Sequence, residues 1–314
     1  ARTVRLAQRR CLFLTFVETP VDLAVIEVGI GGRLDATNLA EPILSLVASI
    51  SLEHTDILGS TLAEIAREKA GIFRSGRPAI AWGGEPEADQ SLHGAAQEIG
   101  ARFYFGEDHV RIRKRTALGW DGQEVELETD GDRYTLKIAL AGEHQAKNLG
   151  LAVAAAEELR ELGALGAHRL DREAITHGAA VCRWPGRLEA ILLPNGCRVV
   201  LDAAHNPEGA AVFARFLAER DEPYDLLFGA LVDKDADAML APLAARAQRI
   251  TLTAPRSERA RNPHDLAAHL GRGEIQVIED PAQALEAALA GAKGSVLAIC
   301  GSIYLVGELR QALR

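Results

Sequence analysis

The sequence predicts an α/β protein built from two successive blocks of apolar strands and helices. The first observation is that short apolar runs of strand length alternate with helical stretches in both halves of the chain. The second is a middle segment, residues 103–140, in which polar and apolar residues alternate as in antiparallel strands. The third is the length of 314 residues, which is enough for two domains with separate cores.

The first block is expected over residues 12–100 as a parallel sheet covered by helices. Continuous apolar strands separated by helices are typical of such a sheet. Ser60 or Thr61 is the expected N-cap of the first helix, with Glu64 in capping-box range and Gly71 at the end. The expected elements of this block are strands 22–27, 43–50 and 78–82 and helices 60–70 and 87–99.

The middle of the chain changes character before a second block begins. Residues 103–140 predict antiparallel strands, and helices are expected at about 145–162 and 171–180. The pair Pro185-Gly186 breaks the helical pattern that precedes it. We therefore place a domain boundary here, between a domain of residues 1–182 and a domain of residues 183–314.

The second block predicts a Rossmann-like domain, because strands and helices alternate again to the end of the chain. Strands are expected near 188–193, 197–202, 225–230, 249–253, 275–278 and 295–300. Helices are expected near 207–220, 235–247, 263–270, 281–291 and 303–313.

Composition excludes several classes of function. The formal net charge of −9 argues against a nucleic-acid-binding surface, which needs a basic patch. No apolar run approaches the length of a membrane span, so no membrane partner is expected. The four cysteines are far apart and form no CxxC pair, which favours a reducing, cytoplasmic setting.

A carboxylate leads directly into a glycine-rich turn in the first block. The apolar run at residues 23–26 is followed by Glu27 and then by Gly29, Gly31 and Gly32. A buried acid at a strand end requires a cation or hydrogen bonds, so the pattern indicates a metal site beside a phosphate-bearing ligand. A dinucleotide fingerprint is disfavoured because Leu34 replaces its last glycine. A salt-bridged strand-end acid explains Glu27 equally well.

Two further residues of the first block can carry chemistry. His54 follows the apolar run 43–50, and it would converge on Glu27 if the two strands were neighbours. A carboxylate and a neutral imidazole can then hold a divalent ion, although a capping or core histidine is the commoner case. Lys69 lies late in the helix 60–70, where a solvated lysine is the ordinary interpretation.

The sharpest feature of the second block is the stretch after the strand 197–202. Asp202 ends that strand, His205 lies in a short turn, and Asn206-Pro207 has the residues that begin a helix. This pattern puts an acid and a histidine beside a helix N-terminus, where anions are stabilised. Ser302 follows the last strand in the same way, either as an N-cap or as a group near the same crevice.

Taken together, these motifs resemble one family, that of folylpolyglutamate synthase and bifunctional dihydrofolate synthase, relatives of the Mur ligases. The resemblance runs from about Phe13 to the C-terminus. It implies an incomplete P-loop-type parallel-sheet ATPase domain, the Mur ligase central domain, followed by a Rossmann-like C-terminal Mur ligase domain. The segments that carry it are EVGIGGRLDATN, SLEHTDILG, REKAGIFRSGRPAI, HQAKNLGLA, WPGRLE, LDAAHNPEGA, LVDKDAD and CGSIYLVGE.

The resemblance implies an ATP-dependent amide ligase of folate biosynthesis and one-carbon metabolism. Such an enzyme phosphorylates the carboxylate of a folate or of dihydropteroate, and the amine of L-glutamate then attacks the acyl phosphate. Mg²⁺ neutralises charge during phosphoryl transfer. The resemblance further implies a cytoplasmic monomer whose partners are ATP, L-glutamate and the folate or dihydropteroate.

The resemblance also implies roles for individual residues, each carried over on its motif. Lys69 is similar to the family's carbamylated lysine, a modification that would turn a cation into an anion. The implied groups are Glu27 and His54 for Mg²⁺; Lys69 and His205 for catalysis; Leu34, Asp35 and Ala36 for the pteroate; Asn148, Arg187 and Asp202 for ATP; and His205 and Ser302, more weakly, for glutamate.

The chain departs from the family pattern in one serious respect. A P-loop of the form GxxxxGK[ST] is expected upstream of the Glu27 motif, and none occurs in the 314 residues. We therefore expect an N-terminally truncated ligase that binds ATP poorly and is inactive by itself. The alternatives are a non-catalytic remnant that binds a folate or a partner, and a Mur-type ligase of peptidoglycan precursors. Glu53, where the family often has Asp, is a mild departure.

Overall fold

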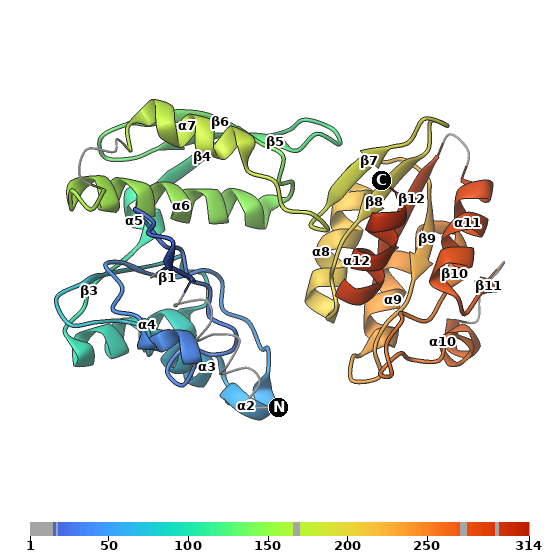
Figure 1. Cartoon of the computed structure of the whole chain (residues 1–314), viewed down its shortest axis with the longest axis horizontal. Coiled ribbons are helices and arrows are strands. Elements are labelled where there is room, and N and C mark those ends of the chain that lie inside the picture. The colour runs from blue at the N-terminus through green and yellow to red at the C-terminus, as the bar shows by residue number, and fades with distance from the viewer. Residues whose placement is uncertain (1–14, 17, 166–169, 271–274, 293–294, 314) are drawn as a thin grey trace. The chain divides into compact units, whose positions relative to one another are not determined.

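The computed structural model describes residues 15–16, 18–165, 170–270, 275–292 and 295–313. Contacts between residues divide the chain into two compact units (Figure 1). The first unit comprises Ala1–Arg115, Glu124–Lys137 and Glu143–Ala180. The second comprises Thr116–Gln123, Ile138–Gly142 and Val181–Arg314.

The first unit contains a three-stranded parallel sheet. Its order is β1 (Ser45–Val47), β2 (Pro78–Ala81) and β3 (Arg102–Phe105). Helices α3 (Leu62–Ala70) and α4 (Pro86–Ile99) pack against each other and share one apolar core with the sheet. This arrangement confirms the parallel sheet that the alternation of strands and helices predicts.

Local signals place α3 well and miss three short elements. Thr61 is the N-cap, and its side chain and that of Glu64 form the capping box. The sequence prediction did not include the 3₁₀ helix η1 (Ala36–Leu39) or the short helices α2 (Thr55–Leu58) and α5 (Gly106–His109). The change of character that the sequence indicates at residue 103 comes too early, because β3 (Arg102–Phe105) still joins the parallel sheet.

The predicted strand at residues 22–27 is wrong. The segment lies outside every strand, and among the described residues no hydrogen bond to the backbone of residues 23–28 is present. Leu23 and Val25 are 38% and 87% exposed. The composition is that of a strand, but a strand forms only where a neighbouring strand pairs with its backbone.

A second small sheet of the first unit follows, as the alternating pattern predicts. It contains β4 (Arg111–Ala117), β5 (Gln123–Glu128) and β6 (Arg133–Ile138) in that order, joined by short turns. Helix α6 (Glu143–Glu161) and helix α7 (Arg172–Val181) come next. Buried side chains of β5, β6 and α6 share a core with Ile80 of β2, so this layer covers the other face of the parallel sheet.

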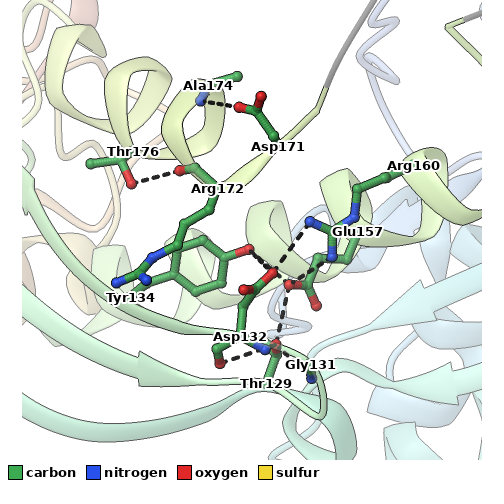
Figure 2. Close-up of polar contacts among 10 residues, drawn as sticks. All are labelled: Thr129, Gly131, Asp132, Tyr134, Glu157, Arg160, Asp171, Arg172, Ala174 and Thr176. Carbon is green, nitrogen blue, oxygen red and sulfur yellow. Dashed lines mark hydrogen bonds and ion pairs between the residues drawn. The ribbon is translucent and has the colours of Figure 1, made fainter.

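A polar cluster ties α6 to the turn between β5 and β6 (Figure 2). The Tyr134 hydroxyl donates to Glu157 at 2.8 Å, and the Thr129 hydroxyl donates to the same carboxylate at 3.1 Å. Arg160 contacts both Asp132, at 3.3 Å, and Glu157, at 3.5 Å. Burial and the Glu157 carboxylate raise the pKa of Tyr134 well above its usual value, so its hydroxyl remains a donor.

The second unit contains a six-stranded sheet in the order β11-β10-β9-β12-β8-β7. Its pairs are parallel except for β7 with β8, which is antiparallel. The strands are β7 (Glu189–Leu192), β8 (Arg198–Leu201), β9 (Tyr224–Phe228), β10 (Ala247–Leu252), β11 (Ile275–Val277) and β12 (Val296–Cys300). All six lie where the sequence predicts strands.

Helices cover both faces of this sheet. Buried residues of α8, α9 and α10 share one core with the sheet, and those of α11 and α12 share a second core on the opposite face. The helices are α8 (Pro207–Ala218), α9 (Ala236–Ala244), α10 (Pro263–Leu270), α11 (Pro281–Gly291) and α12 (Ile303–Ala312). This three-layer arrangement confirms the Rossmann-like prediction.

The tip of the β4–β5 hairpin belongs to the second unit. The Trp120 ring packs edge-on against Phe216 at 5.8 Å, and its indole N–H donates to Glu222 at 3.1 Å. Arg198 and Arg220 lie over the same ring.

The predicted domain boundary between residues 182 and 183 stays a prediction. Among the helices of the described ranges, none combines the length and apolar character needed to cross a membrane.

Candidate functional site

The glycine turn after Glu27 is fastened to the C-terminal end of α3. The Arg33 amide donates to the Glu68 carbonyl at 2.9 Å, and its guanidinium makes two bonds of 3.0 and 2.8 Å to the Glu68 carboxylate. A Cβ added to Gly32 would lie 2.8 Å from the carbonyl oxygens of both Glu68 and Lys69. Glycine is therefore required for this close approach.

Asn38 and Arg74 complete the attachment. The Asn38 amide donates to the carbonyls of Gly71, at 3.0 Å, and Arg33, at 3.1 Å. Arg74 donates to the Asn38 side-chain oxygen at 2.8 Å. Sequence reasoning assigned no role to Arg33, Asn38 or Arg74, although all three lie within the quoted motifs. Each of the three also has a partner more than thirty positions away along the chain, namely Glu68 for Arg33, Gly71 for Asn38 and Asn38 for Arg74, and no local pattern reveals these contacts.

Asp35 closes the turn on itself. Its carboxylate accepts hydrogen bonds from the amides of Gly29, at 3.2 Å, Ile30, at 3.3 Å, and Thr37, at 2.9 Å, and from the Thr37 hydroxyl at 2.7 Å. Asp35 is also the N-cap of η1. The predicted pteroate segment thus contains an acid with structural bonds, an exposed Leu34 and a half-buried Ala36. Its ligand role stays a prediction.

Glu27, His54 and Lys69 lie on three segments that meet at the glycine turn. A Cβ added to Gly31 would lie 2.8 Å from Leu58 of α2 and 4.0 Å from Glu68 of α3. Glu27 is exposed on the extended segment that enters the turn, and Lys69 is half-buried in the last turn of α3.

The prediction that the two candidate metal ligands, Glu27 and His54, each follow directly after a strand is wrong. Glu27 follows no strand, because residues 22–27 form none. His54 does not lie directly after β1, because that strand ends at Val47 and residues 48–53 intervene. His54 instead occupies the N-cap position of α2 with a left-handed φ of 52°, and its exposed side chain makes no capping bond.

The side chains present do not by themselves form a magnesium site. Within the described ranges, no group of three or more His, Cys, Asp or Glu residues could hold a metal ion. Mg²⁺ requires near-octahedral coordination, mostly by oxygen, whereas Glu27 and His54 supply one carboxylate and one imidazole. These residues support no catalytic step through magnesium.

In the second unit, Asp202 is a buried acid held by backbone donors. It follows β8 and is 6% exposed. Its carboxylate accepts hydrogen bonds from the amides of Leu188 and Ala204, both at 2.9 Å. Burial raises the pKa of the Asp202 carboxyl, while the two amides and the charges of Arg187 and His205 oppose that rise without cancelling it.

The turn that carries Arg187 is adjacent to Asp202. Gly186 and Leu188, on either side of Arg187, have left-handed φ angles of 72° and 47°. The Gly186 carbonyl accepts a hydrogen bond from the Ala203 amide at 2.8 Å. The exposed Arg187 side chain and the buried Asp202 carboxylate, two of the three predicted ATP groups, are thus brought together.

The start signals after Asp202 are confirmed. Asn206 caps α8 through a bond from the Gly209 amide at 2.8 Å, and Pro207 is the first helical residue. His205 is exposed, and its Nδ1 lies 3.1 Å from the Ala203 carbonyl oxygen.

The last two candidates lie apart from these in the chain. Ser302 is 1% exposed and caps α12 by accepting from the Tyr304 amide at 3.2 Å, as the N-cap alternative predicts. Asn148 is exposed on α6 in the first unit, and its amide donates to Gln145 at 3.3 Å.

Two known domain families match successive parts of the chain. The Mur ligase middle domain matches residues 8–156, and the glutamate ligase domain of Mur ligases matches residues 186–303. The fold and these matches place the chain in the Mur ligase class.

Comparison with individual proteins narrows the class to one family. The dihydrofolate synthase/folylpolyglutamate synthase of Bacillus subtilis is 34% identical over 313 residues, covering 97% of this chain and 70% of the relative. The Escherichia coli protein of the same name is 33% identical and covers 95% and 66%. The chain therefore belongs to the folylpolyglutamate synthase/dihydrofolate synthase family of Mur ligases, as the sequence motifs predict.

Solved structures agree with this assignment. Folylpolyglutamate synthase of Thermotoga maritima superimposes with a TM-score of 0.79 at 30% identity, over 96% of this chain and 68% of that one. The Mycobacterium tuberculosis folylpolyglutamate synthase complexed with ADP gives 0.82 at 31% identity, over 96% and 70%. The chain spans about 70% of these proteins, and 35% of a probable bifunctional relative from Haloferax volcanii.

Proposed function

We propose that this chain serves the ATP-dependent ligation of L-glutamate to a folate or to dihydropteroate. The observation that supports this most directly is the 34% identity with the B. subtilis enzyme over 97% of this chain. A substrate carboxylate would take the γ-phosphoryl group of ATP, and the glutamate amine would displace phosphate from the acyl phosphate. Residues 1–182 would contribute the ATP-binding part and residues 183–314 the ligase part.

In this proposal the second unit supplies groups for the nucleotide. Arg187 is an exposed cation suited to phosphate oxygens, and the buried Asp202 fixes the turn beside it through the Leu188 amide. Asn148 is proposed as a third ATP contact. The E. coli relative has been solved in complex with DHPP and ADP, which supports a nucleotide as a ligand of this fold.

The remaining assignments are proposals on the same basis. Leu34, Asp35 and Ala36 would border the pteroate, and His205 and Ser302 would lie on the glutamate side. Glu27 and His54 would contribute to Mg²⁺ binding only with ligands from other groups. Lys69 would be carbamylated, and His205 would assist catalysis. We further propose a cytoplasmic monomer.

The 314 residues contain no GxxxxGK[ST] sequence, so we propose that this chain alone binds ATP weakly and does not turn over. The test is ADP release that depends on both glutamate and folate, or on both glutamate and dihydropteroate. The B. subtilis relative, assayed in parallel, is the positive control. ADP release by this chain at a rate comparable with that of the control would contradict the proposal of inactivity and support the ligase function directly.

The absence of a P-loop sequence from the 314 residues also supports the alternative of a non-catalytic protein that binds a folate. A protein without the P-loop sequence could bind a folate without ligating it, and equilibrium binding of a tritiated folate to this chain would reveal that. A Mur-type ligase of peptidoglycan precursors is distinguished by its acceptor, because phosphate release would then require a nucleotide-linked sugar instead of a pterin.

A further inference from the structure

We propose that the ion pair between Glu189 and Arg310 is a brace that fixes the turn at residues 186–188 and thereby positions Arg187 beside Asp202. The inference rests on the nucleotide role proposed above for Arg187 and Asp202. It makes Glu189 and Arg310 positioning residues, because each acts through the turn and not on a ligand.

The brace joins the start of β7 to the last turn of the final helix. Arg310, near the end of α12, donates from Nε and Nη2 to the two Glu189 carboxylate oxygens at 2.7 and 2.8 Å. This two-point geometry fixes orientation as well as distance. Both side chains are only about one-fifth exposed, so water competes weakly for the contact.

The same carboxylate also holds the turn. Glu189 Oε2 accepts a hydrogen bond from the Gly186 amide at 2.7 Å. The turn is therefore held at three points: the Gly186 amide on Glu189, the Gly186 carbonyl on the Ala203 amide, and the Leu188 amide on Asp202. Two of these three points join it to the loop that begins at Asp202.

The backbone conformation shows why a brace is needed. Leu188 has a φ of 47°, a left-handed conformation that is unfavourable for a bulky side chain, and it is 4% exposed. Such strain persists only where surrounding contacts over-determine the backbone, and it is concentrated at functional sites. Released from Glu189, the turn would relax, and both the Leu188 amide and the Arg187 charge would move away from Asp202.

The variants Arg310→Met and Arg310→Lys test the brace on the whole chain. Methionine removes the donors, and lysine keeps the charge but loses the two-point geometry. Arg256→Met is the matched control: it removes a surface arginine that contacts Asp280 and Glu308, both at 3.1 Å, the latter on the same helix α12. If Arg310→Met fails to fold, Arg310→Lys and Glu189→Gln carry the test.

The readout is the backbone amide signals of Gly186 and Leu188, observed by NMR after selective ¹⁵N-glycine and ¹⁵N-leucine labelling. The Leu188 amide also reports the titration of Asp202, whose charged or reactive neighbours are Arg187, His205 and Cys300. Loss of the brace should move both signals. It should also raise the Asp202 titration midpoint further, because the carboxylate loses a donor and a nearby cation.

A merely structural ion pair would give a different result. Arg310→Met would then lower the melting temperature while the two amide signals and the Asp202 midpoint stayed as in Arg256→Met, and the proposal would be overturned. The proposal is supported if both amide signals move and the Asp202 titration midpoint rises in Arg310→Met. The change should be smaller in Arg310→Lys and absent in Arg256→Met.

ADP titration of the same variants separates this inference from the proposed function. If the unmodified chain binds ADP, Arg310→Met should weaken binding about tenfold, as loss of one oriented charged contact does, and Arg256→Met should leave it unchanged. If the unmodified chain does not bind ADP, the nucleotide role in this chain fails, while the NMR result still decides whether the brace positions the turn.

Discussion

The two units differ in how completely their strands are paired. In the second unit, six strands form one sheet with helices on both faces, and every strand lies where the sequence predicts one. In the first unit, the parallel sheet has three strands, and the apolar run at residues 22–27 joins none. The same kind of sequence therefore becomes a core strand in one unit and an exposed segment in the other.

Both units expose some large apolar side chains, but those of the second unit, such as Leu118, Leu192, Val232 and Ile303, are spread along the chain. The first unit has a series of exposed large apolar residues within a single stretch of 37 positions, from 21 to 57. These are Val21, Leu23, Val25, Leu34, Leu39, Leu46, Leu52 and Ile57. At residues 22–27, strand composition alone does not bury the segment, because burial also requires a partner that pairs with the backbone and covers the side chains.

The largest expected effect is in the core of the second unit. Phe213 is fully buried there, so Phe213→Ala should lower the free energy of unfolding of that unit by about 3–5 kcal/mol. Urea denaturation, followed by the fluorescence of Trp120 with the other tryptophans replaced by Phe, measures this. Leu192→Ala, at a side chain 63% exposed, is the control and should change little. Equal losses in both variants would show that the second core is not closely packed.

The next effect tests the close approach in the first unit. Gly32→Ala should destabilise by about 1–3 kcal/mol, because its Cβ would meet two backbone carbonyls at 2.8 Å. Trp82 fluorescence during urea denaturation reports on this unit. The control is Gly94→Ala in α4, where nothing lies within 4 Å, and alanine there should stabilise by about 0.5–1 kcal/mol. A neutral Gly32→Ala would contradict the tight contact between the turn and α3.

A pH-dependent effect is expected at Asp202. Its pKa in the folded protein is raised, so the folded state binds the proton more tightly than the unfolded state does. The free energy of unfolding of the native chain, relative to Asp202→Asn, should therefore fall as pH rises from the unfolded pKa of about 3.9 to the folded value, and then stay constant.

Urea denaturation of both chains over a series of pH values measures that difference. Asp280→Asn is a useful comparison, because hydrogen bonds lower the pKa of this exposed acid and the slope should have the opposite sign. A difference that does not change with pH would mean that burial does not perturb Asp202.

The smallest effect on the free energy of unfolding is expected in the apolar run at residues 22–27, which pairs with no strand. Val25 is 87% exposed, so Val25→Ser should change the free energy of unfolding by less than about 0.5 kcal/mol. The matched variant Val200→Ser, on the fully buried strand β8, should cost several times more. A large loss at Val25 would show that this segment is covered in solution, and the contrast between the two units would then disappear.

Some features of the candidate site can be predicted from local sequence, and others cannot. Thr61 with Glu64 and Asn206 with Pro207 are predictable because a helix start is encoded within a few residues. The bonds of Asp35 to the turn, and that of the Leu188 amide to Asp202, were not predicted. Nothing in the composition of a loop states which amide faces which carboxylate.

The alternation of strands and helices, the helix starts and the family could be predicted from the sequence, because they depend on residues near one another or on motifs that can be read along the chain. Three features became visible only in the folded chain: residues 22–27 form no strand, β3 joins the parallel sheet, and Arg187 lies beside a buried Asp202. The physical reason is that a helix satisfies its backbone within itself, whereas a strand or a buried charge is stabilised only by partners distant in the chain.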